Sequence, residues 1–132
     1  MARVEVIERG TFSGLDYLIV GLSIGHRCGY VRVPEDHPWH DATHEMDPML
    51  SKVRVHGGLT FCGSLDQAKG TWLGFDCAHA GDARDPSLYD DEQRAIQAEY
   101  PWPTFGDETI RTTAYVRDEC EHLAEQIAEA NR

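Results

Sequence analysis

The sequence predicts an α+β fold, in which a single small, mostly antiparallel sheet of about five strands is followed by helices. Two observations support this prediction. Short β-branched and apolar runs, separated by turns that contain glycine or proline, occupy the chain up to residue 82. Beyond residue 86 the apolar residues recur with a helical period. We therefore expect one domain over residues 1–132, with a sheet in 1–82 and a helical part in 86–131.

Five segments have the composition of strands. The first two flank Gly10, Ser13 and Gly14, which are residues typical of a hairpin opening. Residues 63–70 form a loop whose length suits a hairpin between the last two strands. The predicted strands are residues 3–7, 17–24, 29–33, 52–61 and 71–77.

Two helices are expected in the last third of the chain. Ser87 and Asp90 resemble a capping box after Pro86 and would begin a short helix that must end before Pro101. A longer amphipathic helix would begin near residue 107 or 109, because apolar residues follow one another there at steps of three or four. We expect the long helix and the shorter one to cover one face of the sheet. The apolar stripe consists of Ile110, Thr113, Val116, Cys120, Leu123 and Ile127.

The chain is acidic, with 12 basic and 23 acidic residues and a formal net charge of −11. This charge argues against non-specific binding of DNA or RNA, but a local Arg/His pocket can still hold one small anion. No apolar run reaches the roughly 18 residues of a membrane span, and the N-terminus lacks the apolar core of a secretory signal. The four cysteines form no CxxC pair, so we expect reduced thiols in a cytoplasmic protein. The sequence leaves open whether the protein forms a homo-oligomer.

Alternate residues of a strand face opposite sides of a sheet. We expect the aliphatic faces of the strands, together with Cys77, to lie under the long helix. The opposite face combines aromatic, cationic, hydroxyl and carboxylate side chains with glycines, which inside strands accompany a bulge or the close approach of a ligand. We favour a small-molecule pocket, and a bulge on a solvated face is the alternative. The predicted ligand-binding residues are Tyr30, Arg32, His56, Gly57, Gly58, Thr60, Trp72 and Gly74.

An acid–base site is a further candidate. His79 and Asp82 follow the strand 71–77, and side chains at strand ends can converge. With His56 and Asp76 they would form histidine–carboxylate pairs, which titrate near neutral pH. Residues 76–79 (DCAH) also contain ligand types for zinc, although the sequence specifies no metal or cofactor. In the alternative interpretation His79 and Asp82 cap the backbone of the following loop.

Two other sets of reactive side chains need an interpretation. His37, His40 and His44 have helical spacing, but Pro38 predicts an irregular loop. We interpret these histidines, together with His26, which precedes them, as rim or lid groups that are solvated, contact a ligand or bind a metal. Cys62 is the one cysteine expected on the polar face at a strand end, and therefore the one candidate for a nucleophilic thiol.

Four segments of the chain resemble an uncharacterised family of small proteins encoded by bacteriophages and prophages. They are HRCGYVRVPEDHPWH (26–40), VHGGLTF (55–61), TWLGFDCAHAGD (71–82) and YVRDECEHLAEQI (115–127), and the resemblance covers about residues 26–127. It implies a phage accessory protein that acts in the cytoplasm of the host cell. Because phage accessory genes often encode counter-defence proteins, including small sponges for nucleotide signals, it also suggests a counter-defence role.

Three functions remain open at this point. The first is binding of a small, phosphorylated or nucleotide-like ligand, whose ring stacks on Trp72 or Tyr30 while Arg32 and His56 meet its anionic group. The second is a small hydrolase that uses the histidine–aspartate site, with or without zinc. The third is an acidic protein-interaction module that uses the segment PWPTF (101–105). We rank ligand binding first.

Overall fold

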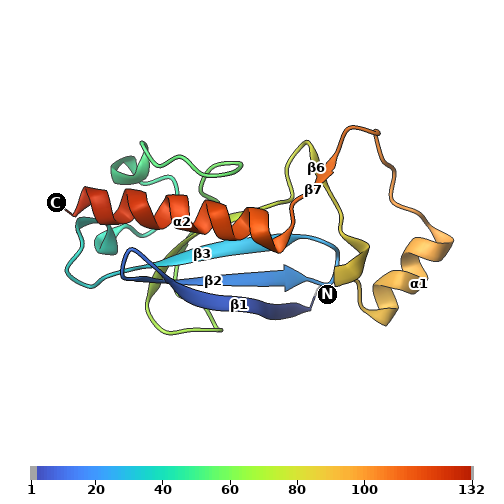
Figure 1. The fold of residues 1–132 in the computed structure, drawn as a ribbon, viewed down its shortest axis with the longest axis horizontal. Helices are drawn as coiled ribbons and strands as arrows, with labels where there is room; N and C mark the ends of the chain where they lie inside the picture. The colour runs from blue at the N-terminus through green and yellow to red at the C-terminus, as the bar shows by residue number, and fades with distance from the viewer. Residues whose placement is uncertain (1–2, 132) are drawn as a thin grey trace.

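The computed structural model describes residues 3–131 and confirms the α+β architecture (Figure 1). Its main sheet is antiparallel, with the strand order β1-β2-β3-β5-β4. These strands are β1 (Val4–Phe12), β2 (Leu15–Leu22), β3 (Arg27–Val33), β4 (Phe61–Gly63) and β5 (Thr71–Asp76). In a second sheet β6 (Asp82–Ala83) pairs in parallel with β7 (Thr109–Ile110). The helices are α1 (Asp91–Glu99) and α2 (Thr113–Ala130), and 3₁₀ turns occupy Pro38–Asp41, Pro48–Leu50 and Pro86–Leu88.

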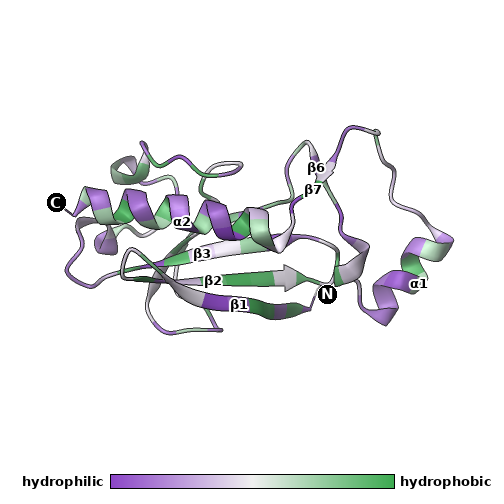
Figure 2. Ribbon diagram, in the orientation of Figure 1, coloured by the Kyte–Doolittle hydropathy of each residue, from purple (hydrophilic) through white to green (hydrophobic). Residues whose placement is uncertain are grey.

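Helix α2 covers one face of the main sheet and closes the larger core, with its apolar stripe turned toward the strands (Figure 2). Thr112 caps the helix by accepting a hydrogen bond from the backbone N–H of Tyr115. Gly29 allows the sheet and the helix to approach closely, because a Cβ there would lie 2.6 Å from the ring of Phe75 and 2.8 Å from Cys120 Sγ. Cys77 is 2% exposed and belongs to this core, as predicted. The core stripe of α2 is Val116, Cys120, Leu123, Ala124 and Ile127.

The opposite face of the sheet carries a second, smaller apolar cluster. Trp72 is 3% exposed within it, and its indole N–H donates to the carbonyl of Lys69 at 3.1 Å. The ring of Tyr30 lies against Gly74, where an added Cβ would be 2.3 Å from ring atom Cδ1. A close approach at Gly74 was expected from a ligand, but the ring of Tyr30 makes it instead. The cluster consists of Leu18, Val20, Cys28 and Trp72, with Val6, Leu22, Tyr30, Phe61, Leu65 and Ala68 packed against it.

The predicted strand 52–61 is wrong over most of its length. Residues 53–60 form an irregular loop, and only β4 is extended. Gly57 and Gly58 have φ values of 69° and 81°, and the N–H of Gly58 donates to the carbonyl of Val55 at 2.8 Å. This turn breaks the alternation of faces, so Phe61 packs on the second cluster and Cys62 on the larger core. Cys62 therefore lies on the side opposite to the one predicted.

Helix α1 lies beyond the end of the main sheet (Figure 1). Asp90 caps it by accepting the N–H of Gln93 at 2.8 Å, whereas Ser87 lies in the preceding 3₁₀ turn. No residue of α1 is buried, so α2 provides the helical cover of the sheet without the contribution expected from the shorter helix. Within residues 3–131 no helix has the length and apolar character of a membrane span.

Candidate functional site

The four predicted acid–base residues gather where the main sheet meets the start of α2. The carboxylate of Asp82 is their centre, and its side chain is 1% exposed. It accepts hydrogen bonds from His56 Nε2 at 2.9 Å and from Arg111 Nε at 2.8 Å. The backbone N–H of His79 donates a third at 3.0 Å. The structure therefore joins three separate segments at this one carboxylate.

His56 uses both ring nitrogens within this group. Its Nδ1 accepts the hydroxyl of Tyr115 at 2.7 Å, so the ring proton is assigned to Nε2, which donates to Asp82. The backbone N–H of His56 donates to Glu119 Oε1 at 2.7 Å. These bonds hold the loop 53–60 against the first turns of α2. We call His56, Asp82, Arg111 and Tyr115 the Asp82 cluster.

The electrostatics of the Asp82 cluster favour an ionised carboxylate. Burial opposes ionisation of Asp82, but hydrogen bonds from His56, Arg111 and the N–H of His79 outweigh it and hold the pKa of the carboxyl below its ordinary value. Burial raises the pKa of the Tyr115 phenol, so its hydroxyl remains protonated and donates to His56. The cluster is thus a closed hydrogen-bond network with a clear structural role.

A pocket of about 560 Å³ lies on the outer side of Asp82, between residues 78–86 and 101–108. Its volume is within the range of small-molecule sites, roughly 300–1,000 Å³. The two bounding segments are brought together where β6 pairs with β7. We call this the Trp102 pocket, and the lining residues that matter below are His26, His79, Asp82, Arg84, Trp102 and Glu108.

The wall of the Trp102 pocket contains three buried nitrogen atoms without hydrogen-bond partners. They are His26 Nδ1, His79 Nε2 and Arg84 Nε. In residues 3–131 the one other buried side-chain polar atom of this kind is Arg32 Nε. Because buried polar groups in folded proteins are almost always hydrogen-bonded, such atoms mark places where water or a ligand completes the structure. Three of the four such atoms in the described residues therefore line this one pocket.

His79 forms the boundary between the pocket and the Asp82 cluster. Its Nε2 lies 3.0 Å from Asp76 Oδ1, an ion-pair distance at which the two groups are not aligned for a hydrogen bond. Its ring packs on the backbone of Gly57, where a Cβ would lie 2.4 Å from Nε2. The centroids of the His56 and His79 rings are 6.2 Å apart. The predicted acid–base residues therefore converge, with Asp76 beside His79 and Asp82 bonded to His56.

Arg84 and Trp102 form the outer wall. The guanidinium carbon of Arg84 lies 3.7 Å from the centroid of the indole, a cation–π stack, and Trp102 is still 57% exposed. Burial lowers the pKa of His26 against the opposing effect of a backbone hydrogen bond with Cys77, and the charge of Arg84 acts in the same direction as burial. His26 is therefore neutral at pH 7 and can either donate or accept a hydrogen bond. Cation, neutral imidazole and aromatic face thus border one cavity.

Sequence reasoning did not identify Arg84 or Trp102 as site residues. His26 was expected among the rim or lid histidines, and Trp102 was placed only in the segment PWPTF. The contact between residues 82–83 and 109–110 that brings Arg84 and Trp102 together is a pair of two-residue strands. Such short strands have no alternation that a sequence pattern could reveal.

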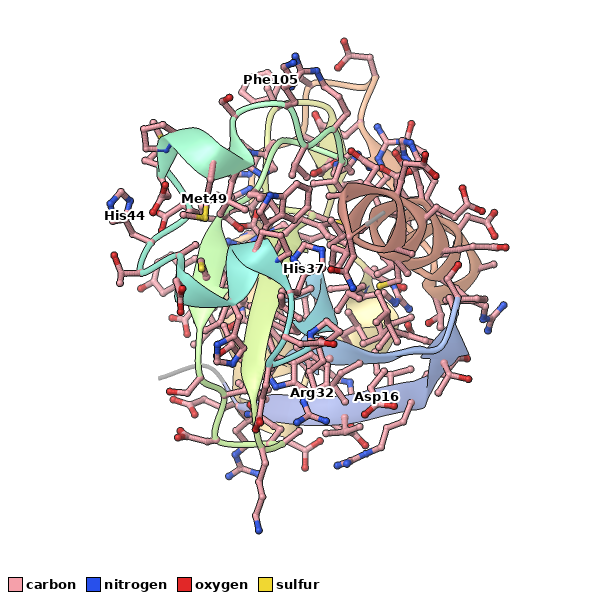
Figure 3. All side chains as sticks on the ribbon, turned by 90° about the vertical axis from the view of Figure 1, so that its left-hand side faces the viewer. Asp16, Arg32, His37, His44, Met49 and Phe105 are labelled. Atoms are coloured by element: carbon pink, nitrogen blue, oxygen red, sulfur yellow. The ribbon has the colours of Figure 1, made fainter. Side chains whose placement is uncertain are left out.

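The predicted ligand-binding residues do not form one site. His56 belongs to the Asp82 cluster, and Gly57 supports His79. Thr60 is exposed, and a Cβ at Gly58 would meet nothing within 4 Å. Figure 3 shows Arg32 beside Asp16 on the side of the sheet away from α2. The predicted residues on this second face are Tyr30, Arg32, Trp72 and Gly74.

The histidine-rich loop does not line the Trp102 pocket. His37 is 4% exposed, and its Nε2 donates to the carbonyl of Ile127 at 2.7 Å while its Nδ1 accepts the N–H of Trp39 at 2.9 Å. In Figure 3 His37 points into the molecule and His44 lies at its outer edge. His37 therefore anchors the loop to the end of α2, contrary to the expected rim or lid.

Cys62 lacks the environment of an activated nucleophile. Its thiol donates to the carbonyl of Ala42 at 3.4 Å, and burial raises its pKa, with Asp47 and Glu45 acting in the same direction. A nucleophilic thiol needs the opposite shift. Cys62 was a candidate because it was expected on the polar face of the sheet. The turn at Gly57 and Gly58 changes the alternation and places Cys62 against the larger core.

In the described part of the chain, residues 3–131, no three His, Cys, Asp or Glu side chains converge as a group that could hold a metal ion. The zinc-dependent form of the hydrolase hypothesis therefore has no ligand set there. Comparison of the chain with models of protein families, with curated proteins and with solved structures gave no match. The interpretation of function thus rests on the geometry of the site.

Proposed function

We propose that the protein binds a small, phosphorylated or nucleotide-like ligand in the Trp102 pocket. The observation that supports this most directly is the convergence of two unpartnered nitrogens, on His26 and Arg84, on one cavity of about 560 Å³ that His79 also lines. Each leaves a hydrogen bond that a ligand can supply, and supplying it removes a cost of roughly 1–3 kcal/mol per buried group.

The chemistry of the wall suits a ligand with an anionic group and a ring. The planar guanidinium of Arg84 matches phosphate oxygens, and the exposed face of Trp102 offers a surface on which a base can stack. Two carboxylates also line the pocket, and they differ in their partners. Asp82 is paired with Arg111 and His56, and Glu108 accepts the backbone N–H of Phe105.

The biological part of the proposal is a phage accessory protein in the host cytoplasm, with a counter-defence role. Its support is the motif resemblance over about residues 26–127. Sequestration of a nucleotide signal would need only a binding pocket and no turnover, which agrees with the closed hydrogen bonding of the Asp82 cluster.

Isothermal titration calorimetry with a panel of nucleoside monophosphates, cyclic nucleotides and non-aromatic phosphate esters tests the proposal. Arg84→Gln should weaken binding about ten- to hundredfold, the value of a charge-assisted hydrogen bond. Arg94→Gln, on the exposed face of α1, is the matched control and should bind as the wild type does. Binding by no member of the panel, or a loss with Arg32→Gln and not with Arg84→Gln, would contradict the proposed pocket.

A metal-free hydrolase is the second candidate, and the pair formed by Asp76 and His79 at the pocket wall favours it. The Asp76 carboxylate lies 3.0 Å from His79 Nε2, and this imidazole could accept a proton from a water molecule attacking the ligand. His79→Asn should then abolish turnover, followed by phosphorus NMR, while the ligand still binds, about tenfold more weakly because one contact is lost. Unchanged ligand after prolonged incubation with the wild type would exclude this candidate and leave the binding proposal standing.

A further inference from the structure

A second cavity, of about 480 Å³, lies on the face of the main sheet away from α2. It is bordered by β1, β2, β3, β5 and the loop that precedes β5. The residues used below are Arg9, Asp16, Leu18, Arg32, Lys69 and Trp72. None of them lines the Trp102 pocket, so the two cavities are separate sites.

Strand register explains why cationic side chains meet here. Arg9 pairs with Leu18 across β1 and β2, and Arg32 pairs with Trp72 across β3 and β5, which places all four on the same face. Lys69 comes from the loop 64–70, where its carbonyl accepts the indole N–H of Trp72 at 3.1 Å. The arrangement is therefore built into the sheet and not left to flexible side chains alone.

These cations have few partners of their own. Arg32 Nη1 is 3.9 Å from Asp16 Oδ2, which is longer than a hydrogen bond, and Arg32 Nε is buried without a partner. Within residues 3–131 neither Arg9 nor Lys69 takes part in an ion pair. Three cations thus face one carboxylate on a chain whose net charge is −11. In such an acidic protein carboxylates are abundant, and their scarcity around this cavity requires an explanation.

The loop is also shaped to receive Arg32. Gly70 has a φ of 112°, and a Cβ there would lie 2.4 Å from Arg32 Nε. Glycine lets the loop backbone pass directly over the guanidinium stem, which holds the stem in place and leaves its terminal nitrogens at the cavity. A positioned guanidinium loses less conformational entropy when it binds than a free one does.

We propose that this second cavity is an anion site that binds a phosphate or sulfate group. A tetrahedral oxyanion presents oxygen atoms to several cations at once, and Arg32, Arg9 and Lys69 converge from three different segments. The site is independent of the Trp102 pocket, so the protein has two places for anions, one bordered by an exposed aromatic ring and one without.

Titration of ¹⁵N-labelled protein with inorganic phosphate at constant ionic strength tests the proposal. The amides of Gly10, Arg32 and Gly70 and the indole N–H of Trp72 should shift together and saturate. Sulfate should act in the same way, and acetate should bind at least about fivefold more weakly. Shifts that do not saturate, or equal effects of acetate and phosphate, would overturn the oxyanion site.

Variants of exposed cations separate specific binding from general screening. Arg9→Gln and Lys69→Gln should each weaken phosphate binding about three- to tenfold without loss of folding, because both side chains are exposed. Equal affinity in the double variant would overturn the proposal. Arg84→Gln should leave these shifts unchanged, so failure here and failure at the Trp102 pocket are distinguishable.

Discussion

The Asp82 cluster and the wall of the Trp102 pocket are neighbours built from the same residue types, but they differ in how their buried polar atoms are hydrogen-bonded. In the cluster, His56 and Arg111 both donate to the Asp82 carboxylate, and the second nitrogen of His56 is also engaged. In the wall, His26 and Arg84 each keep a buried nitrogen without a partner. Asp82 borders both.

This difference assigns different roles to similar side chains. In a closed network, hydrogen bonds within the protein offset the desolvation cost of the buried polar groups, so the network stabilises the fold. An open set of donors is costly until another molecule arrives, and proteins keep such sets at functional sites. The histidine–aspartate pair that is most conspicuous in the sequence is therefore structural, and the ligand site that we propose lies next to it.

The largest expected effect is on stability, from removal of the central carboxylate. Asp82→Ala leaves His56, Arg111 and the N–H of His79 unpartnered, and should lower the free energy of unfolding by about 3–5 kcal/mol. Asp118→Ala, at an exposed position of α2, should change it by less than about 0.5 kcal/mol. Urea denaturation measures both. A loss below about 1 kcal/mol for Asp82→Ala would show that the network is not structural.

The second largest effect compares the stability contributions of two arginines, one fully hydrogen-bonded and one with an unpartnered nitrogen. Arg27 Nη1 donates to Asp85 at 2.9 Å and Arg27 Nε to Thr113 at 3.1 Å, so Arg27→Gln should destabilise the protein by about 2–4 kcal/mol. Arg84→Gln breaks no hydrogen bond of the folded chain and removes the stack on Trp102, which is worth roughly 0.5–1 kcal/mol. Equal losses of unfolding free energy in urea would mean that Arg84 is structural as well.

Two adjacent glycines test whether His79 is positioned by the loop beneath it. Gly57 and Gly58 both have left-handed backbones, which cost an alanine about 1–2 kcal/mol. A Cβ at Gly57 also overlaps the ring of His79, whereas one at Gly58 has open space. Gly57→Ala should therefore cost about 1–2 kcal/mol more than Gly58→Ala, by urea denaturation, and only Gly57→Ala should weaken ligand binding. Identical effects would remove the argument for a positioned His79.

The smallest effect is a dependence on pH at another fully partnered carboxylate. Hydrogen bonds from Arg117 and Tyr17 lower the pKa of Glu8 from 4.5 to about 2. Because this pKa is lower in the folded than in the unfolded chain, the contribution of Glu8 to stability is present above about pH 4.5 and is lost as the pH falls toward 2. Glu8→Gln should be less stable than the wild type at pH 7, and the two should converge near pH 2. A constant difference between their urea midpoints at the two pH values would contradict this.

Periodicity predicted those parts of the fold in which many residues repeat one pattern. The stripe of α2 from Val116 to Ile127 and the buried parity of Leu73, Phe75 and Cys77 in and after β5 are of this kind. The loop 53–60 was mistaken for a strand because alternation does not record the sign of φ, and two left-handed glycines end the strand pattern there.

The candidate site was predicted in part. His56, Asp76, His79 and Asp82 do lie together, although His56 arrives on a loop and both of its nitrogens are occupied. The wall formed by Arg84 and Trp102 depends on the pairing of β6 with β7, a long-range contact between two-residue strands that local sequence cannot specify. The Asp82 cluster and the proposed pocket differ in whether their buried polar atoms have hydrogen-bond partners. This difference can be seen only in the folded structure.

The most direct test of the central claim is a long-range ¹H–¹⁵N NMR titration of side-chain nitrogens with adenosine 5′-monophosphate and with a cyclic dinucleotide. Arg84 Nε and the ring nitrogens of His26 should shift and saturate with one dissociation constant, as unpartnered atoms acquire a partner, and those of His79 should shift with them because its ring lines the same pocket. The ring nitrogens of His56 should stay where they are, because both are already bonded. Shifts confined to His56, or no saturable shift at His26, His79 and Arg84 with either ligand, would contradict the assignment of the Trp102 pocket as the nucleotide-binding site.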